Sequence, residues 1–150
     1  LCGAPVNATR ALVLNEGRGQ AGLAAGELLA HRGIATEIVT SDIAVAADLD
    51  PTNRAAWYQR LGERNCTFTA IHVVESINAQ TVVLRNVFDD RLSNREDIDL
   101  IVDWPGCRAN DELITGWSDN LPQMFSIGDC RAPRTVEIAI SEAAAVANQI

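Results

Sequence analysis

The chain contains no lysine. Its 12 basic residues are all arginines, and 20 acidic residues outweigh them to give a net charge of −8 at neutral pH. An acidic surface disfavours contact with phosphate backbones and anionic lipid headgroups. The composition therefore argues against nucleic acid and membrane surfaces as partners.

Long apolar runs are also missing. The longest apolar stretches fall well short of the roughly 20 residues that a membrane-spanning helix needs, and no charged segment followed by an apolar one opens the chain as in a signal peptide. We therefore expect a cytoplasmic protein. The 150 residues fit one domain with a core of its own. Because the chain begins at Leu1, we expect it to be part of a longer protein.

Cysteine is sparse and scattered along the chain. Cys2, Cys66, Cys107 and Cys130 contain no C-x-x-C pair, so their local spacing assembles neither a zinc site nor an iron–sulfur cluster. A disulfide framework is not expected in a chain of this size with an ordinary core composition. We expect these side chains to act as small buried hydrophobes.

Histidine is scarce too. His31 lies at the end of the first expected helix, where a cation complements the helix dipole, and His72 lies in an expected strand. Neither has a carboxylate or hydroxyl partner nearby in the sequence. Ordinary structural roles are therefore favoured over catalysis, and we expect no catalytic residue in this chain.

The most informative stretch is an apolar run at residues 11–14 that leads through a glycine turn into a helix-like segment at residues 23–30. Gly17, Gly19 and Gly22 have the G-x-G-x-x-G spacing. A dinucleotide pyrophosphate must approach backbone N–H groups at a helix N-terminus, so side chains have to be absent there.

In this interpretation Gly17 allows the tight turn, Gly19 the approach of the phosphates, and Gly22 the close packing of helix on strand. Gln20 and Ala21, within the turn, belong to the same candidate nucleotide site. The alternative is that the glycines only make a tight turn between strand and helix.

A second strand is expected at residues 37–40, after Gly33 in the position of a helix C-cap glycine, so the unit predicts a βαβ fold with a parallel sheet. Nucleotide sites of this kind place Asp or Glu about 20 residues after the glycines to hold the ribose hydroxyls. Here that position is Thr40, which could donate one hydrogen bond, and Asp42 could reach back. No nearby arginine pairs a 2′-phosphate, so NAD and NADP are not distinguished.

The next elements follow from caps and periodicity. Asp50-Pro51 predicts a helix start after an alanine-rich loop at residues 43–49, with a helix to about Glu63. Trp57 and Leu61 should share its inner face, and Tyr58 could be core or rim. Residues 66–88 predict an antiparallel meander that turns at residues 78–80.

The remaining elements are expected as follows: a central strand within residues 97–104, a short helix at 111–117, a strand at 123–127, and a final helix at 134–150. The final helix places small apolar residues on one face at helical spacing, namely Ala139, Ile140, Ala143, Val146, Ala147 and Ile150. That face suits close packing against a sheet, and the sheet need not belong to this chain.

Three motifs together carry a family resemblance. They are the glycine turn, residues 104–113 (WPGCRANDEL) and residues 127–134 (IGDCRAPR). With them the chain resembles the C-terminal half of NADH:flavin oxidoreductases of the trimethylamine dehydrogenase and 2,4-dienoyl-CoA reductase type. In that family an Old Yellow Enzyme-like barrel with FMN and a 4Fe–4S cluster precedes two domains similar to the FAD- and NAD(P)-binding domains of glutathione reductase.

The resemblance implies an α/β fold: a Rossmann-like parallel sheet with flanking helices and a small antiparallel meander. It implies a connector at residues 1–9, an NAD(P)-binding-like domain at 10–122, and a strand and helix at 123–150 that return to an FAD/ADP-binding-type domain. FMN and the 4Fe–4S cluster are expected in the rest of the enzyme.

The resemblance also implies roles for individual residues. The turn glycines match the phosphate-binding turn, and Gly106 matches a glycine of the crossover segment near the nicotinamide. Gly128 and Asp129 match a Gly-Asp pair whose carboxylate contacts the ribityl or pyrophosphate part of a flavin. The alternative for Asp129 is an N-cap of the final helix.

Two functions of different class remain open. One is the nucleotide-binding portion of a flavin-dependent oxidoreductase, holding NAD(P)H or ADP/FAD and supporting hydride or electron transfer. Its partners would be the FMN barrel domain of the same enzyme and an electron-transfer flavoprotein. The other is a non-catalytic, degenerate Rossmann-like structural or docking domain that holds ADP or no nucleotide.

Overall fold

The computed structural model describes residues 6–17, 19–116 and 123–149. The chain divides into two compact units, Leu1–Gly106 and Cys107–Ile150. The border expected at residues 122/123 divides the chain by function, between an NAD(P)-binding-like part and an FAD/ADP-binding-type part. This functional division stays a prediction.

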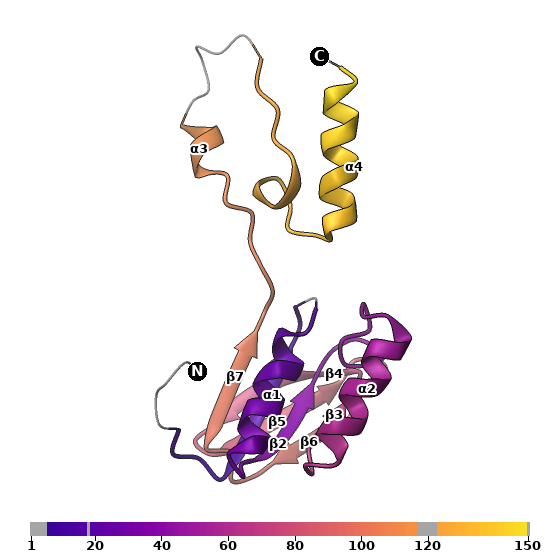
Figure 1. Cartoon of the computed structure of the whole chain (residues 1–150). Coiled ribbons are helices and arrows are strands. Elements are labelled where there is room, and N and C mark those ends of the chain that lie inside the picture. Colours follow the sequence, from indigo (N-terminus) through magenta and orange to yellow (C-terminus); the bar gives the residue numbers. More distant parts are fainter. Residues whose placement is uncertain (1–5, 18, 117–122, 150) are drawn as a thin grey trace. The chain divides into compact units, whose positions relative to one another are not determined.

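The first unit is built on a parallel sheet in the order β3-β2-β1-β7 (Figure 1). Its elements are β1 (Arg10–Asn15), α1 (Ala21–His31), β2 (Ala35–Val39), α2 (Pro51–Gly62), β3 (Thr67–Thr69) and β7 (Leu100–Trp104). The expected βαβ unit is confirmed, because β1 and β2 pair in parallel with α1 between them. The carboxyl ends of all four strands therefore meet at one edge of the sheet.

A second, antiparallel sheet in the order β4-β5-β6 belongs to the same unit. It consists of β4 (His72–Asn78), β5 (Thr81–Asn86) and β6 (Leu92–Arg95). The predicted α/β fold with a Rossmann-like parallel sheet, flanking helices and a small meander is therefore confirmed.

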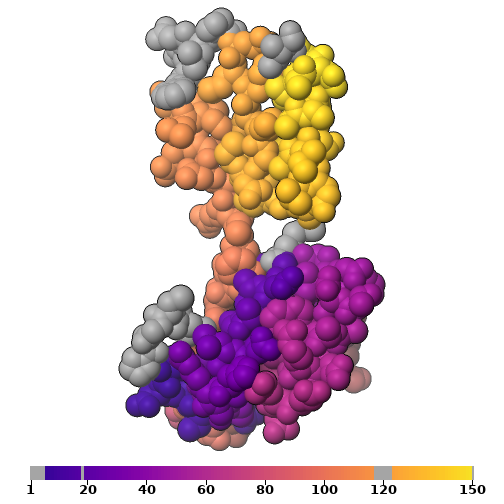
Figure 2. Space-filling model, viewed as in Figure 1, coloured from indigo at the N-terminus to yellow at the C-terminus, as the bar shows by residue number. Residues whose placement is uncertain are grey.

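The parallel sheet has a core on each face because side chains alternate along β1. Ala11 and Val13 belong to the cluster that α1 and α2 cover, whereas Leu12 packs with Val82 and Leu84 of β5. The unit is thus layered as helices, parallel sheet and antiparallel sheet (Figure 1). Figure 2 shows the helical face, with atoms of α1 and α2 side by side.

Local chemistry explains where the two helices of the first unit begin and end. α1 ends in a Schellman-type cap, in which Gly33 at φ +78° donates to the Ala30 carbonyl and Ile34 to Leu29. α2 begins where predicted, because the Asp50 carboxylate accepts hydrogen bonds from the N–H groups of Thr52 and Asn53.

Packing on the inner face of α2 follows the prediction in part. Leu61 is fully buried, and Trp57 is partly buried against the same core. Tyr58 combines both expected roles, since its ring stacks on Phe68 while its hydroxyl donates to the Val45 carbonyl.

Two strand predictions in the first unit were wrong. Thr67–Thr69 does not belong to the meander but joins the parallel sheet beside β2, because α2 returns the chain to that edge. β7 is an edge strand that pairs only with β1 among the described residues, not a central one. Its run is apolar because Leu100 and Ile101 contribute to the cores on opposite faces.

The second unit contains α3 (Glu112–Thr115), a 3-10 turn η1 (Gly128–Cys130) and α4 (Val136–Ala147). The expected strand at residues 123–127 does not form, since no described segment of the second unit offers it a pairing partner. Trp117, the expected end of α3, and Ile150 lie outside the described residues.

The second unit shows no interior of its own among its described residues. None of its described residues, 107–116 and 123–149, is buried. The apolar face of α4 is open as well, with Val136 67% and Ile140 65% exposed. Across the described chain, no helix has the length and apolar character that crossing a bilayer requires.

Candidate functional site

Gly17 is required for the chain after β7 to pass over the glycine turn. Its N–H donates to the Trp104 carbonyl at 2.8 Å. A Cβ at this position would lie 2.4 Å from Trp104 Nε1 and 2.6 Å from Gly106 Cα. The structure thus brings Gly17 and Gly106 together, backbone against backbone, as a packing contact.

Gly22 allows α1 to approach the end of β1. A Cβ on Gly22 would lie 1.9 Å from the Asn15 side-chain oxygen. Asn15 is 3% exposed, and this oxygen has no hydrogen-bond partner among the described residues. Close packing of helix on strand is the role that the spacing predicts for this glycine.

Gly19 differs from the other two glycines because no atom stands where its side chain would be. Its φ is +83°, and a Cβ would meet nothing within 4 Å. Its N–H, next to the start of α1, donates to the Asp48 carboxylate at 2.8 Å. Gln20 follows as the N-cap residue of α1 and Ala21 as its first residue.

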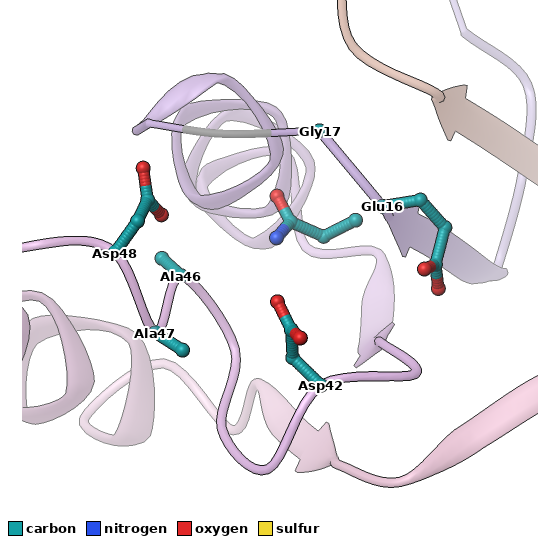
Figure 3. Close-up of a pocket in the computed structure, with 7 residues that line it drawn as sticks. Glu16, Gly17, Asp42, Ala46, Ala47 and Asp48 are labelled. Atoms are coloured by element: carbon teal, nitrogen blue, oxygen red, sulfur yellow. The ribbon is translucent and has the colours of Figure 1, made fainter. Parts of the chain in front are cut away.

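A cavity of about 420 Å³ lies beside the glycine turn, which we call the acidic hollow. It is lined by Asn15, Glu16, Gly17, Asp42, Ala46, Ala47 and Asp48. Figure 3 shows Asp42 and Asp48 on the segment that faces Gly17, with their carboxylates directed toward the space between, while the Glu16 side chain points away from them. The carboxyl edge of a parallel sheet is where open α/β folds bind ligands.

Of the two residues expected at the ribose end of the site, Asp42 lines the acidic hollow and Thr40 does not. Thr40 is 1% exposed and does not line the acidic hollow, and its hydroxyl oxygen accepts from the Asp42 N–H. The Glu16 carboxylate accepts from the N–H and hydroxyl of Ser41. Asp42 does line the acidic hollow, and no hydrogen bond of its carboxylate is found among the described residues.

In the second unit, Gly128 and Asp129 lie in η1. The Gly128 N–H donates to the Glu142 carboxylate at 2.8 Å, and Arg131 and Arg134 contact the same carboxylate. The Gly128 bond and the two arginines hold the pKa of the Glu142 carboxyl below its usual range.

The expected alternative for Asp129, an N-cap of the final helix, was wrong. α4 begins later, with Thr135 at its N-cap position. The Asp129 carboxylate instead accepts from the Arg134 N–H. A role for Asp129 in flavin binding remains a prediction.

The described cysteine and histidine side chains do not form a cluster. Among the described residues, no group of three or more His, Cys, Asp or Glu side chains has the arrangement of a metal site. Cys66 is buried as expected, but Cys107 is exposed and Cys130 half-buried; Cys2 lies outside the described residues. His72 contacts the Ala70 carbonyl through Nδ1.

Cys66 should be protected from thiol reagents in the folded chain. Burial, assisted by the Glu37 carboxylate, raises the pKa of the Cys66 thiol from 9.0 to about 11. We expect a reagent at about pH 8 to modify exposed Cys107 and to leave Cys66 untouched until denaturant is added, as mapped by mass spectrometry.

The same raised pKa has a consequence for stability. The folded chain retains the thiol proton to higher pH than the unfolded chain. The contribution of this protonated thiol to the free energy of unfolding is therefore complete below about pH 9 and declines as the pH rises toward 11. In the labelling experiment, fast modification of Cys66 by the thiol reagent without denaturant would contradict the burial of this side chain.

Sequence reasoning missed three side chains of the site. Asp48, Glu16 and Asn15 all line the acidic hollow. Asn15 ends β1 and Glu16 follows it directly before the glycines, so the closeness of both residues to the turn was readable from the sequence. Asp48 is 29 residues from Gly19, and only the path of the 42–49 segment brings it there.

The fold and the glycine turn define an α/β domain of the Rossmann-like class. No family model matches the chain. In sequence it is 28% identical over 157 residues to N,N-dimethylglycine/sarcosine dehydrogenase of Chromohalobacter salexigens, a match covering 82% of this chain and 22% of the dehydrogenase.

Two solved structures share the fold over most of the chain. Histamine dehydrogenase from Rhizobium sp. 4-9 matches with a TM-score of 0.74 and 21% identity, covering 95% of this chain and 23% of that enzyme. The 6-hydroxypseudooxynicotine amine oxidase from Pseudomonas geniculata N1 matches with a TM-score of 0.72 and 19% identity, covering 89% and 21%.

The chain thus spans about a fifth of the length of these relatives. They are two dehydrogenases and an amine oxidase, all enzymes of oxidation and reduction. The resemblance seen in the sequence, to a part of larger oxidoreductases of the amine dehydrogenase kind, is therefore confirmed.

Proposed function

We propose that this chain is the nucleotide-binding portion of a flavin-dependent oxidoreductase of the NADH:flavin oxidoreductase, amine dehydrogenase or enoyl reductase type. The observation that carries the proposal is the cradle at Gly19. There a backbone N–H, whose hydrogen bond the Asp48 carboxylate accepts, precedes α1 at a residue with open space in place of a side chain, beside a cavity at the carboxyl edge of the parallel sheet.

The residues fit a nucleotide in an extended position across this edge. The turn from Gly17 to Gly22 would face the pyrophosphate, and Asp42 would accept hydrogen bonds from ribose hydroxyls. Asn15, buried and with an unpaired oxygen, would gain a polar partner. A bound NAD(P)H would supply hydride, while these residues bind and orient it.

The chemical step itself belongs to the rest of the proposed enzyme. The glycine site offers carboxylates and backbone N–H groups, and the described residues form no metal cluster. FMN and the 4Fe–4S cluster are proposed for the remainder of the enzyme, with an electron-transfer flavoprotein as a further partner. The second unit, which has no buried residue of its own among those described, would pack there as part of an FAD/ADP-binding-type domain. The cytoplasmic location stays an expectation.

Thermal melts with nucleotides test this proposal. NADH, NADPH, ADP and FAD are added singly to the chain at fixed protein concentration. We expect one of them to raise the melting temperature, since a ligand at 100 times its Kd adds about 2.7 kcal/mol of stability. Gly19→Asp should abolish the shift, because a carboxylate then stands in the phosphate position.

Gly33→Asp is the matched control. Gly33 has φ +78° and, like Gly19, open space where a side chain would be, but it lies at the other end of α1. The control variant should keep the nucleotide shift. A shift that survives Gly19→Asp would refute the placement of the site.

The second candidate function is a structural or docking domain that holds no nucleotide. It is favoured by one contact, the Asp48 carboxylate on the Gly19 N–H, which puts a protein anion where a phosphate would go. If none of the four nucleotides changes the melting temperature of the wild-type chain or of a variant lacking the Asp48 carboxylate, this second candidate is the correct one.

A further inference from the structure

Asp48 places a negatively charged group at the position that the proposed function assigns to phosphate. The 42–49 segment joins β2 to α2, and Asp48 extends from it to the glycine turn. A carboxylate shares with a phosphate its charge and its oxygen acceptors, and the region before a helix N-terminus favours both.

A second feature of the acidic hollow indicates that a ligand belongs there. Asn15 is 97% buried, lines the acidic hollow, and keeps a side-chain oxygen without any hydrogen-bond partner among the described residues. Buried polar atoms nearly always have partners, so an unpaired one beside a cavity needs an explanation. The acidic hollow thus contains an unpaired buried polar side chain together with Asp48, whose carboxylate occupies the neighbouring donor at Gly19.

We propose that Asp48 is an internal competitor for the phosphate position, so that a nucleotide binds only after the Asp48 carboxylate leaves the Gly19 N–H. This inference rests on the proposed function, and it adds an autoinhibitory contact to the same site. The contact weakens binding of any nucleotide whose pyrophosphate uses that N–H, and it selects for ligands whose other contacts compensate.

The rest of the segment allows Asp48 to leave without unfolding. Val45 and Ala46 are buried, and the Val45 carbonyl accepts from the Tyr58 hydroxyl at 2.9 Å. The Ala47 carbonyl accepts from Arg54. Asp48, in contrast, is exposed, and among the described residues its carboxylate bonds to the Gly19 N–H alone. A side-chain rotation of Asp48 therefore frees the donor while the anchored residues stay in place.

The test compares ADP binding by isothermal titration calorimetry for the wild-type 150-residue chain and the variants Asp48→Asn and Asp48→Ala. We expect both variants to bind ADP at least about tenfold more tightly than wild type, which corresponds to about 1.4 kcal/mol. Asp42→Asn removes the same charge from the acidic hollow without freeing the Gly19 N–H, and it also weakens the proposed ribose acceptor, so it should not tighten ADP binding.

Asp97→Asn is the control for net charge. Asp97 precedes β7 and so lies toward the amino end of the parallel strands, away from the acidic hollow, and its φ of +59° is one that Asn tolerates. It should leave the ADP affinity at the wild-type value. An Asp97→Asn effect as large as that of the Asp48 variants would overturn the proposal, because charge alone would then explain the gain.

The remaining outcomes separate the two proposals. If wild type and both Asp48 variants bind ADP equally well, the competitor is refuted and the proposed function stands. If no variant binds ADP, NADH, NADPH or FAD, both are refuted. The Gly19 amide resonance gives an independent readout: it should shift in Asp48→Ala without nucleotide, and an unchanged resonance would refute the contact.

Discussion

Ile38→Ala is expected to lower the free energy of unfolding by about 2–5 kcal/mol, the range for truncating a large aliphatic side chain in a core. Ile38 lies in β2, is fully buried, and belongs to the core cluster shared with Leu23 and Leu29 of α1. Its Cδ1 atom would lie 2.6 Å from a Cβ on Gly26, so this side chain fills the contact between strand and helix.

The loss combines the transfer free energy of the removed methyl and methylene groups with the cost of a cavity that neighbouring atoms cannot fill. Urea unfolding followed by circular dichroism measures it. Ile77→Ala is the matched control, because Ile77 of β4 is 53% exposed and its truncation should cost at most about 0.5 kcal/mol. Equal losses at the two positions would contradict the observed packing of α1 on β2.

Gly17→Ala is expected to destabilise the chain by about 3 kcal/mol in the absence of any nucleotide, at the upper end of the range for overpacking. The new Cβ would overlap Trp104 Nε1 and the backbone of Gly106. The Trp104 indole could rotate away, but the Gly106 backbone belongs to the segment that follows β7 and cannot rotate away as a side chain can. We therefore expect the hydrogen bond from Gly17 to the Trp104 carbonyl to break.

The control for this prediction is Gly62→Ala. Gly62 ends α2, and a Cβ there would meet nothing within 4 Å. Alanine at such a position should be neutral or stabilise by about 0.4–1 kcal/mol, because it restricts the unfolded chain. If Gly17→Ala proves as harmless as Gly62→Ala without ligand, Gly17 serves phosphate approach alone and its packing role is refuted.

Local sequence predicted the βαβ unit and the cap of α2 correctly because each depends on neighbouring residues. An apolar run, a glycine turn and a helical period specify β1 and α1, and Asp50-Pro51 specifies the start of α2. The close approach expected of Gly22 was also readable, since the glycine spacing itself indicates that a helix packs tightly on a strand.

The errors arise where the pairing partner of a segment decides its structure. The run at residues 97–104 is apolar because both faces of β7 are covered, and this coverage does not reveal that β7 has one strand neighbour in the part of the chain that the structure describes. Thr67–Thr69 has a strand-like composition in either sheet, and pairing with β2 decided between them. Residues 123–127 are apolar enough for a strand but find no ladder to join in the second unit.

By itself the sequence determined the glycine cradle, because the absence of side chains at Gly17, Gly19 and Gly22 is a property of those residues. Only the tertiary structure decided what meets each glycine: Gly106 at Gly17, Asn15 at Gly22 and Asp48 at Gly19. Contacts between residues far apart in the chain depend on the paths of β7 and of the 42–49 segment. Those paths are set by burial on both faces of the sheet, which no local pattern specifies.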